Sequence, residues 1–146
     1  MNNWFECKVS YDKLLENGMQ KKVTEPYLVD ALSFTEAEKR IIEELRPFFS
    51  GDFSVAGIRR ARISEIFFND LGDRYFRFKI NFVTLDEKSG AEKKTACTMI
   101  AQAGTLKDAI DILEKGMKGT MADYEIASVA ETPLMNIFTF SAGKDK

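Results

Sequence analysis

The sequence of 146 residues contains no histidine and only two cysteines, three prolines and one tryptophan. Without histidine the chain lacks the most common general base and the most common zinc ligand. This absence excludes Ser-His-Asp triads, Cys-His nucleophiles and histidine-based metal sites. Cys7 and Cys97 lie far apart in strand-like sequence, so we interpret both as small buried apolar residues rather than as a disulfide or redox pair. We expect no metal and no cofactor.

Long apolar segments are also missing. No stretch approaches the roughly 20 apolar residues of a membrane span, and the first residues, MNNWFECK, lack the basic-then-apolar layout of a secretory signal. We therefore expect a cytoplasmic protein that does not bind a membrane. The net charge of −2 gives no global attraction to nucleic acid, so an anion site would have to be a local basic patch.

Carboxylates are plentiful, but none belongs to a recognisable catalytic motif. The sequence has no D-x-D, no E-x-x-H and no glycine-rich phosphate loop that opens a helix. Glu25 is the one carboxylate in a core register, where it could act as a general acid or base, lie at an edge reached by water, or pair with Arg59. Because a single carboxylate without a base partner is a weak signal, we predict that the protein is not an enzyme.

The strongest signal in the chain is an internal repeat. Four blocks match in the same order at an offset of 71 or 72 residues: "WFECKVSY" (4–11) with "YFRFKINF" (75–82), "GMQKKVTEPYLVDA" (18–31) with "GAEKKTACTMIAQA" (90–103), "SFTEA" (33–37) with "TLKDA" (105–109), and "DFSVAGIRRARISEIF" (52–67) with "DYEIASVAETPLMNIF" (123–138). Chance similarity of one apolar run does not explain this order. We infer a single compact domain, 1–146, made of two repeats, about 3–70 and 74–140, with a disordered tail, 141–146.

Each repeat has the pattern of a β-β-α-β unit. The first two blocks alternate apolar and polar residues, which is typical of half-buried strands, and glycine between them suits a hairpin turn. Ser33 and Thr105 each precede a carboxylate by three residues, which predicts the N-cap of a helix. The last block of each repeat, 52–67 and 123–138, is predicted to be one strand.

A unit of about 70 residues is marginal alone, because the buried fraction of the surface falls with chain size. We therefore expect the two repeats to pack together about a pseudo-two-fold axis. The predicted fold class is α+β, with a mostly antiparallel sheet or sheets and both helices packed on one side.

An arginine cluster distinguishes the repeats. Arg59, Arg60 and Arg62 align with Ala130, Glu131 and Pro133. Alternation places Arg60 and Arg62 on one face of the strand and Arg59 on the other. One interpretation is structural, with Arg60 or Arg62 paired with Glu131 or Glu65 across the sheet.

The other interpretation of the cluster is an anion site. The candidate ligand-binding residues are Arg59, Arg60, Arg62, Lys21, Lys22, Lys93 and Lys94. In this hypothesis Lys8 or Lys79 adds charge, and Trp4, Tyr75 or Tyr27 stacks a base, because exposed aromatics beside basic residues on a sheet are typical of proteins that bind single strands or nucleotides. The paired lysines also fit a simpler role, in which they discourage edge-to-edge aggregation.

The blocks "WFECKVSY", "KKVTEPYLVDALSFTEAEKRI" and "RRARISEIFF" resemble a small uncharacterised family from Bacteroidetes and from their phages and mobile elements. The similarity covers most of the chain. It implies a bacterial or phage accessory protein but supplies no activity and no functional residues.

Two functions from different classes remain open. In the first, the protein binds an anionic ligand, either single-stranded nucleic acid or a nucleotide, through a local patch of arginine and lysine. In the second, it is a protein–protein interaction module or a homo-oligomeric adaptor with no role in nucleic-acid binding.

Overall fold

The computed structural model describes residues 3–139, which form two compact units. Unit 1 comprises residues 3–62 and 133–139, and unit 2 comprises residues 63–132. Each unit is a four-stranded sheet with one α-helix, so the fold class is α+β, as predicted. The predicted tail, 141–146, lies outside the described residues.

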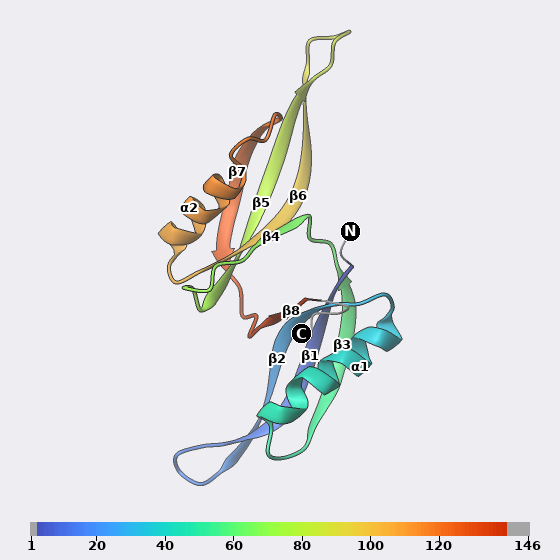
Figure 1. Ribbon diagram of the computed structural model, residues 1–146, viewed down its shortest axis with the longest axis vertical. Coiled ribbons are helices and arrows are strands. Elements are labelled where there is room, and N and C mark those ends of the chain that lie inside the picture. Colours follow the sequence, from blue (N-terminus) through green and yellow to red (C-terminus); the bar gives the residue numbers. More distant parts are fainter. Residues whose placement is uncertain (1–2, 140–146) are drawn as a thin grey trace. The chain divides into compact units, whose positions relative to one another are not determined.

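Unit 1 is built on a long hairpin of β1 (Trp4–Leu14) and β2 (Gln20–Asp30). The chain continues through α1 (Phe34–Leu45) and a short 3-10 helix, η1 (Arg46–Phe48), into β3 (Phe53–Ala61), which pairs with β1 in antiparallel orientation. The fourth strand, β8 (Ile137–Phe138), pairs in parallel with β2. The strand order is therefore β3-β1-β2-β8 (Figure 1).

Unit 2 has the same order of elements. Its hairpin consists of β5 (Arg74–Leu85) and β6 (Glu92–Ala103), followed by α2 (Leu106–Gly116) and β7 (Asp123–Glu131), which pairs with β5. The fourth strand is β4 (Glu65–Phe67), parallel to β6, and the strand order is β4-β6-β5-β7. The register of the third strand shifts after Lys8 in unit 1 and after Lys79 in unit 2, which are equivalent positions.

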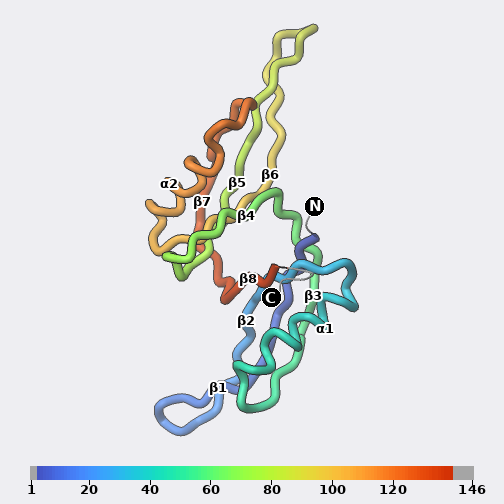
Figure 2. Tube along the Cα trace, in the orientation of Figure 1, coloured from blue at the N-terminus to red at the C-terminus, as the bar shows by residue number. Residues whose placement is uncertain are grey.

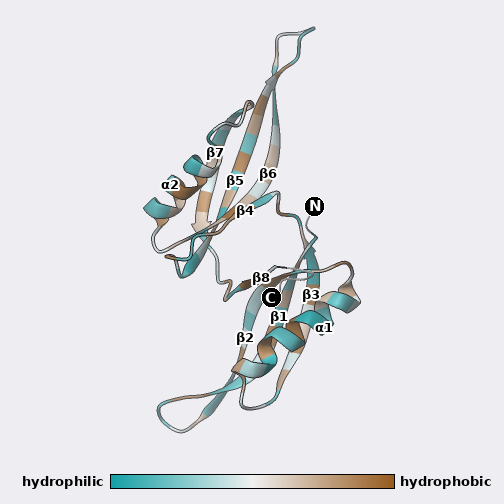
Figure 3. Ribbon diagram, in the orientation of Figure 1, coloured by the Kyte–Doolittle hydropathy of each residue, from teal (hydrophilic) through white to brown (hydrophobic). Residues whose placement is uncertain are grey.

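Local sequence explains these elements. Hydrophobic and hydrophilic residues alternate along β5, visible as successive bands in Figure 3, so that one face of the sheet is apolar. Gly18 and Gly90 have positive φ in the two hairpin turns, a conformation that glycine adopts without a steric penalty. The Ser33 hydroxyl accepts a hydrogen bond from the Glu36 N–H, and the Thr105 hydroxyl accepts one from the Asp108 N–H, both at 3.1 Å. Both predicted N-caps are therefore confirmed.

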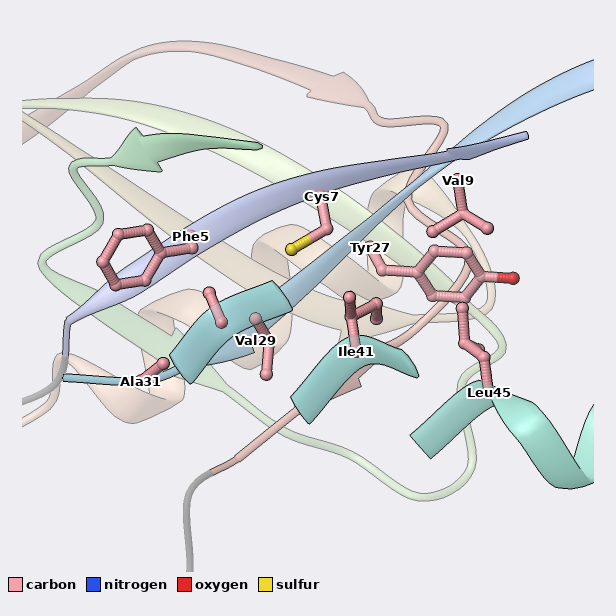
Figure 4. Packing of buried hydrophobic residues seen from close by; sticks show 9 residues of the cluster. Phe5, Cys7, Val9, Tyr27, Val29, Ala31, Ile41 and Leu45 are labelled. Carbon is pink, nitrogen blue, oxygen red and sulfur yellow. The ribbon is translucent and has the colours of Figure 1, made fainter. Parts of the chain in front are cut away.

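The core of each unit lies between its helix and the apolar face of its sheet. In unit 1, fully buried side chains of β1, β2 and α1 point toward one another (Figure 4), among them Phe5, Cys7, Val29 and Ile41. Burial, followed by the nearby Glu6 carboxylate, raises the pKa of the Cys7 thiol to about 12. Cys7 is thus a neutral, buried core residue, and Cys97 is a free, half-buried one.

The block at 52–67 is not the single strand that was predicted. It divides into β3, which belongs to unit 1, and β4, which belongs to unit 2. In the same way β8 follows β7 in the sequence but pairs with β2 of unit 1. The trace in Figure 2 leaves one unit through residues 62–64 and returns through residues 132–136. Each unit is therefore completed by a short strand from the other half of the chain.

Gly116, at the end of α2, makes room for the exchanged strand β4. A Cβ atom at this position would overlap the Phe67 ring, which packs against the core of unit 2. We expect Gly116→Ala to lower the free energy of unfolding by about 1–3 kcal/mol through overpacking, although alanine is the better helix former by about 1 kcal/mol. Chemical denaturation would measure this change.

Gly104→Ala is the matched control, because a Cβ atom there meets no atom within 4 Å. Its effect should stay within about 0.5 kcal/mol. Adding Phe67→Leu to Gly116→Ala should recover part of the loss. Equal stability of the Gly116 and Gly104 variants would contradict the proposed fit of Phe67 against α2.

Candidate anion-binding groove

Arg59 satisfies a buried carboxylate of unit 1. Its Nε and Nη2 atoms donate to Glu6 Oε1 at 3.1 and 2.5 Å, and Glu6 lies directly opposite it on β1. The Glu6 side chain is only 11% exposed, so it needs this partner. The pairing of Arg59 with Glu25, one of the expected alternatives, is therefore wrong.

Arg60 lies on the opposite face from Arg59, as alternation predicted. Its guanidinium carbon is 5.1 Å from the ring centroid of Phe5 and 5.9 Å from that of Phe34, within the range of a cation–π contact. In unit 2, the Glu131 carboxylate lies 3.7 Å from the Arg74 guanidinium. Thus two of the three arginines have structural contacts within their own unit.

Arg62 is exposed and follows the last residue of β3. This position leaves it as the one member of the cluster without a structural role in the described part of the chain.

The candidate lysines of unit 1, Lys21 and Lys22, lie far from its arginines. In unit 1, Arg60 lies opposite Phe5, whereas Lys21 lies opposite Lys13, eight residues further along β1, or about 26 Å. Lys22 is next to Lys21 in the same arm of the hairpin. The predicted patch therefore does not form within unit 1.

The lysines of the second hairpin, Lys93 and Lys94, belong to unit 2. Lys94 donates to Glu125 Oε2 at 3.0 Å. Lys93 lies opposite Thr84 in the hairpin arm. Within unit 2, this pair therefore lies in the hairpin arm, where Glu125 already engages Lys94.

The aromatic residues that were expected to stack a base are not accessible. Trp4, Tyr27 and Tyr75 are each no more than 7% exposed. Burial, followed by the Glu25 carboxylate, raises the pKa of the Tyr27 hydroxyl to about 12. The stacking hypothesis is therefore wrong for these three residues.

A groove of about 320 Å³ crosses the outer face of unit 2, on the side of the sheet away from the core. Three adjacent strands line it: β5, β6 and β7. The lining residues are Arg77, Phe78, Lys79, Ala96, Cys97, Thr98, Ser128 and Ala130. The Phe78 side chain belongs to the core cluster, so the groove is lined mainly by cationic, hydroxyl and small side chains.

The pairing register explains the shape of the groove. Lys79 lies opposite Thr98 on one side and opposite Ser128 on the other, so the base of its side chain stands between two hydroxyl-bearing residues. Arg77 precedes Lys79 by two residues and points to the same face, about 7 Å away along β5. Ala130 lies opposite Arg77, and its small side chain leaves the space beside the guanidinium open.

The same positions of unit 1 are closed by an ion pair. Glu6 lies opposite Arg59 where unit 2 has Arg77 opposite Ala130. Unit 2 thus has Arg77 at the position of the Glu6 carboxylate and Ala130 at the position of the long Arg59 side chain. Arg77 therefore has no carboxylate opposite it on β7, and a hollow occupies the space beside the small Ala130 side chain.

The hydroxyls show a similar contrast. Lys8, the equivalent of Lys79, lies opposite Pro26 and Gly57, neither of which has a polar side chain. In unit 2 these positions are Thr98 and Ser128. Within residues 3–139, no hydrogen bond involves either hydroxyl and no ion pair involves Arg77 or Lys79, so these polar groups remain available to a ligand.

The electrostatics of the groove favour an anion. No carboxylate lines it. Glu125 lies opposite Asn81, two residues beyond Lys79 on β5, and accepts hydrogen bonds from Lys94 at 3.0 Å and Asn81 at 3.2 Å. The hydrogen bond from Lys94 and then that from Asn81 lower the pKa of Glu125, so this carboxylate stays ionised but is already neutralised by its neighbour.

Sequence reasoning missed Arg77, Thr98 and Ser128, although it considered Lys79. The signal was present in the repeat alignment, where Arg59 matches Ala130 and Glu6 matches Arg77. Only the first match was considered, and it was interpreted as a loss of charge. The two matches together would have indicated that the positions of the Glu6–Arg59 ion pair in the first repeat hold an arginine without a carboxylate partner, Arg77, in the second.

A second hollow, of about 360 Å³, lies between the end of α1 and the start of β3 in unit 1. Arg46 and Asp52 both line it, so it carries charges of both signs. Among residues 3–139, no three histidine, cysteine, aspartate or glutamate side chains gather as metal ligands. Over the same residues, neither helix is long and apolar enough to cross a membrane.

Fold and groove define an α+β protein of two similarly built units, one of which presents a basic groove on its sheet. The chain belongs to a family described as a domain of unknown function, DUF4494, whose model matches residues 3–140. No curated protein and no solved structure matches the chain.

The ion pair of unit 1 gives a stability prediction. Arg59→Ala leaves the Glu6 carboxylate buried without its partner, so we expect the free energy of unfolding to fall by about 1–3 kcal/mol. Arg62→Ala removes the same charge from an exposed position and should cost no more than about 0.5 kcal/mol. Urea denaturation of both variants would test this difference, and equal losses would show that Glu6 does not depend on Arg59.

Proposed function

We propose that the protein is a non-enzymatic binder of a phosphate-bearing ligand and that the groove of unit 2 holds the phosphate. One observation carries this proposal: Arg77 and Lys79 lie two residues apart in a hollow without carboxylates, whereas in unit 1 the corresponding pair of positions is occupied by Glu6 and Arg59, which form an ion pair with each other. Cations without an internal partner on a rigid sheet are suited to an external anion.

The residue types fit phosphate in particular. An arginine fork donates two parallel hydrogen bonds to phosphate oxygens, and a lysine adds a compact point charge. The hydroxyls of Thr98 and Ser128, on either side of Lys79, supply further donors. All four groups project from paired strands, so the binding geometry is largely formed before the ligand arrives.

Two sources of phosphate are compatible with the groove: single-stranded nucleic acid and a free nucleotide. None of the aromatic residues expected to stack a base is exposed, so recognition would act through the phosphate rather than through the base. The resemblance to proteins of Bacteroidetes and their phages supports a role as a bacterial or phage accessory protein that acts on such ligands.

Fluorescence anisotropy tests the proposal with three labelled probes: a single-stranded oligonucleotide, the matching duplex and a nucleotide. We expect Arg77→Ala/Lys79→Ala to raise Kd by at least about tenfold, because two charge-assisted contacts are lost. Binding by the wild type should also weaken steeply with salt if several phosphates are neutralised. Tight binding of the nucleotide alone would identify a nucleotide site, and binding that grows with strand length would identify nucleic acid.

The chain provides a control with the same change of charge. Lys8→Ala/Lys22→Ala removes two cations from unit 1, and Lys8 is the structural equivalent of Lys79. This variant should bind within about twofold of the wild type, which is the size of a surface-charge effect. A similar loss in both variants would mean that binding is a diffuse charge effect, and no binding of any probe at low salt would overturn the proposal.

A graft offers a second test of the groove. Arg77→Glu/Ala130→Arg rebuilds in unit 2 the ion pair that Glu6 and Arg59 form in unit 1. We expect this variant to keep its thermal stability, because the same ion pair already forms on the equivalent strands of unit 1. We expect it to lose binding, because the introduced arginine fills the hollow and pairs with the introduced carboxylate. Thermal melts and anisotropy would be measured on the same samples. Retained binding would place the ligand elsewhere.

A further inference from the structure

The C-terminal strand β8 reaches unit 1 by a very short connection from unit 2. The Thr132 N–H and hydroxyl both donate to the Tyr75 carbonyl of unit 2 at 2.8 Å. Only Pro133 and Leu134 separate this anchor from Met135, whose N–H donates to the Pro26 carbonyl of unit 1 at 2.9 Å. Proline fixes its own φ and biases the residue before it toward extended conformations, so this hinge is short and stiff.

Packing of its side chains, more than backbone pairing with β2, holds β8 in place. The strand has two residues, which lie opposite Leu28 and Val29 of β2. Ile137 is buried, and the Phe138 ring stacks on Tyr27 with a centroid distance of 6.1 Å. Removal of β8 would expose these apolar surfaces of unit 1, so its place beside β2 must be filled by a strand with matching side chains.

The two exchanged strands differ in how the chain holds them. β4 and β8 share the dipeptide Ile-Phe, Ile66–Phe67 and Ile137–Phe138, and pair with equivalent residues of β6 and β2. However, β4 is followed by all the elements of unit 2, whereas β8 is the last element within residues 3–139. Of the two, β8 is thus the strand that can leave its sheet without dismantling a unit.

From the short hinge, the side-chain anchors and the terminal position of β8, we infer that the partner of this protein is a second copy of the chain. In this dimer, β8 of each copy lies beside β2 of the other. Every contact of β8 with β2 is preserved, and only the hinge changes direction, which is why exchange of a terminal element is a low-cost route to a dimer. The monomer prevails in dilute solution, because pairing of β8 within its own chain does not depend on protein concentration, whereas exchange between two copies does.

Each copy would then carry one groove, so the dimer would present two. This geometry would strengthen binding to a ligand with several phosphates by avidity, without any new contact. The exchange itself does not rest on the proposed function, and its test uses no ligand.

The test uses two chains with one new cysteine each, in a Cys7→Ala/Cys97→Ser background. One chain carries Leu28→Cys and the other Ile137→Cys, at positions that face each other in the ladder. The two are mixed, unfolded, refolded at low or high protein concentration and oxidised with oxidised glutathione. A disulfide between the two different chains forms only where β8 of one lies on β2 of the other. Mass spectrometry and non-reducing gels identify this product.

Ile66→Cys and Ile100→Cys form the matched control pair, because they occupy the equivalent positions on β4 and β6. We expect the heterodisulfide of the β8 pair to be the main cross-linked product after concentrated refolding and to be absent after dilute refolding. The β4 pair should give none. No heterodisulfide from the β8 pair, or equal amounts from both pairs, would overturn the proposal.

A second measurement needs no buried substitution. Sedimentation velocity of the unmodified chain should show a discrete dimer after concentrated refolding. Insertion of a Gly-Ser-Gly-Ser segment after Pro133 should remove most of this dimer, since a longer, flexible hinge allows β8 to fold back onto its own unit. A dimer that is unchanged by the insertion would show that another surface joins the copies.

Discussion

Everything else in this structure depends on the two-residue period of the central hairpins. In β1–β2 and in β5–β6, one face of the ladder is apolar and packs against a single helix, so the main core of each unit lies on that side. The other face carries the polar residues of the site, together with buried apolar side chains such as Leu28 and Ile100, which lie opposite Glu6 and Arg77. A register slip by one residue would exchange the two faces, and for this reason the long hairpins specify both the core and the groove.

Because the two units have the same order of elements, equivalent positions that carry different residues can be compared within one chain. In unit 1 the polar face is self-satisfied: Glu6 pairs with Arg59, and the Ser10 and Thr24 hydroxyls bond each other at 2.8 Å. In unit 2 the corresponding face carries cations and hydroxyls that no described residue engages. Similar backbones thus carry polar faces of different character, one with its arginine paired and one with two unpaired cations in its groove.

Local rules were sufficient for much of the fold. Alternation, the glycines of the hairpin turns and the Ser33 and Thr105 caps each depend on residues close in sequence, and each was predicted correctly. The split of 52–67 into β3 and β4 was not predictable in this way, because a three-residue strand has no periodicity of its own and its partner is chosen by distant residues. The partner of Arg59 was missed for a related reason: Glu6 is opposite Arg59 only through a register that the bulge after Lys8 sets.

The exchange of β4 and β8 also bears on how the chain can be made. The sheet of unit 1 lacks its last strand until Ile137 and Phe138 have been synthesised, although β1, β2, α1 and β3 leave the ribosome first. During that interval, the side chains that β8 covers, such as Tyr27, remain open to solvent and to neighbouring nascent chains. Unit 2 receives β4 before its other strands and can close as soon as β7 appears. The half of the protein that is translated first is therefore the half that is finished last.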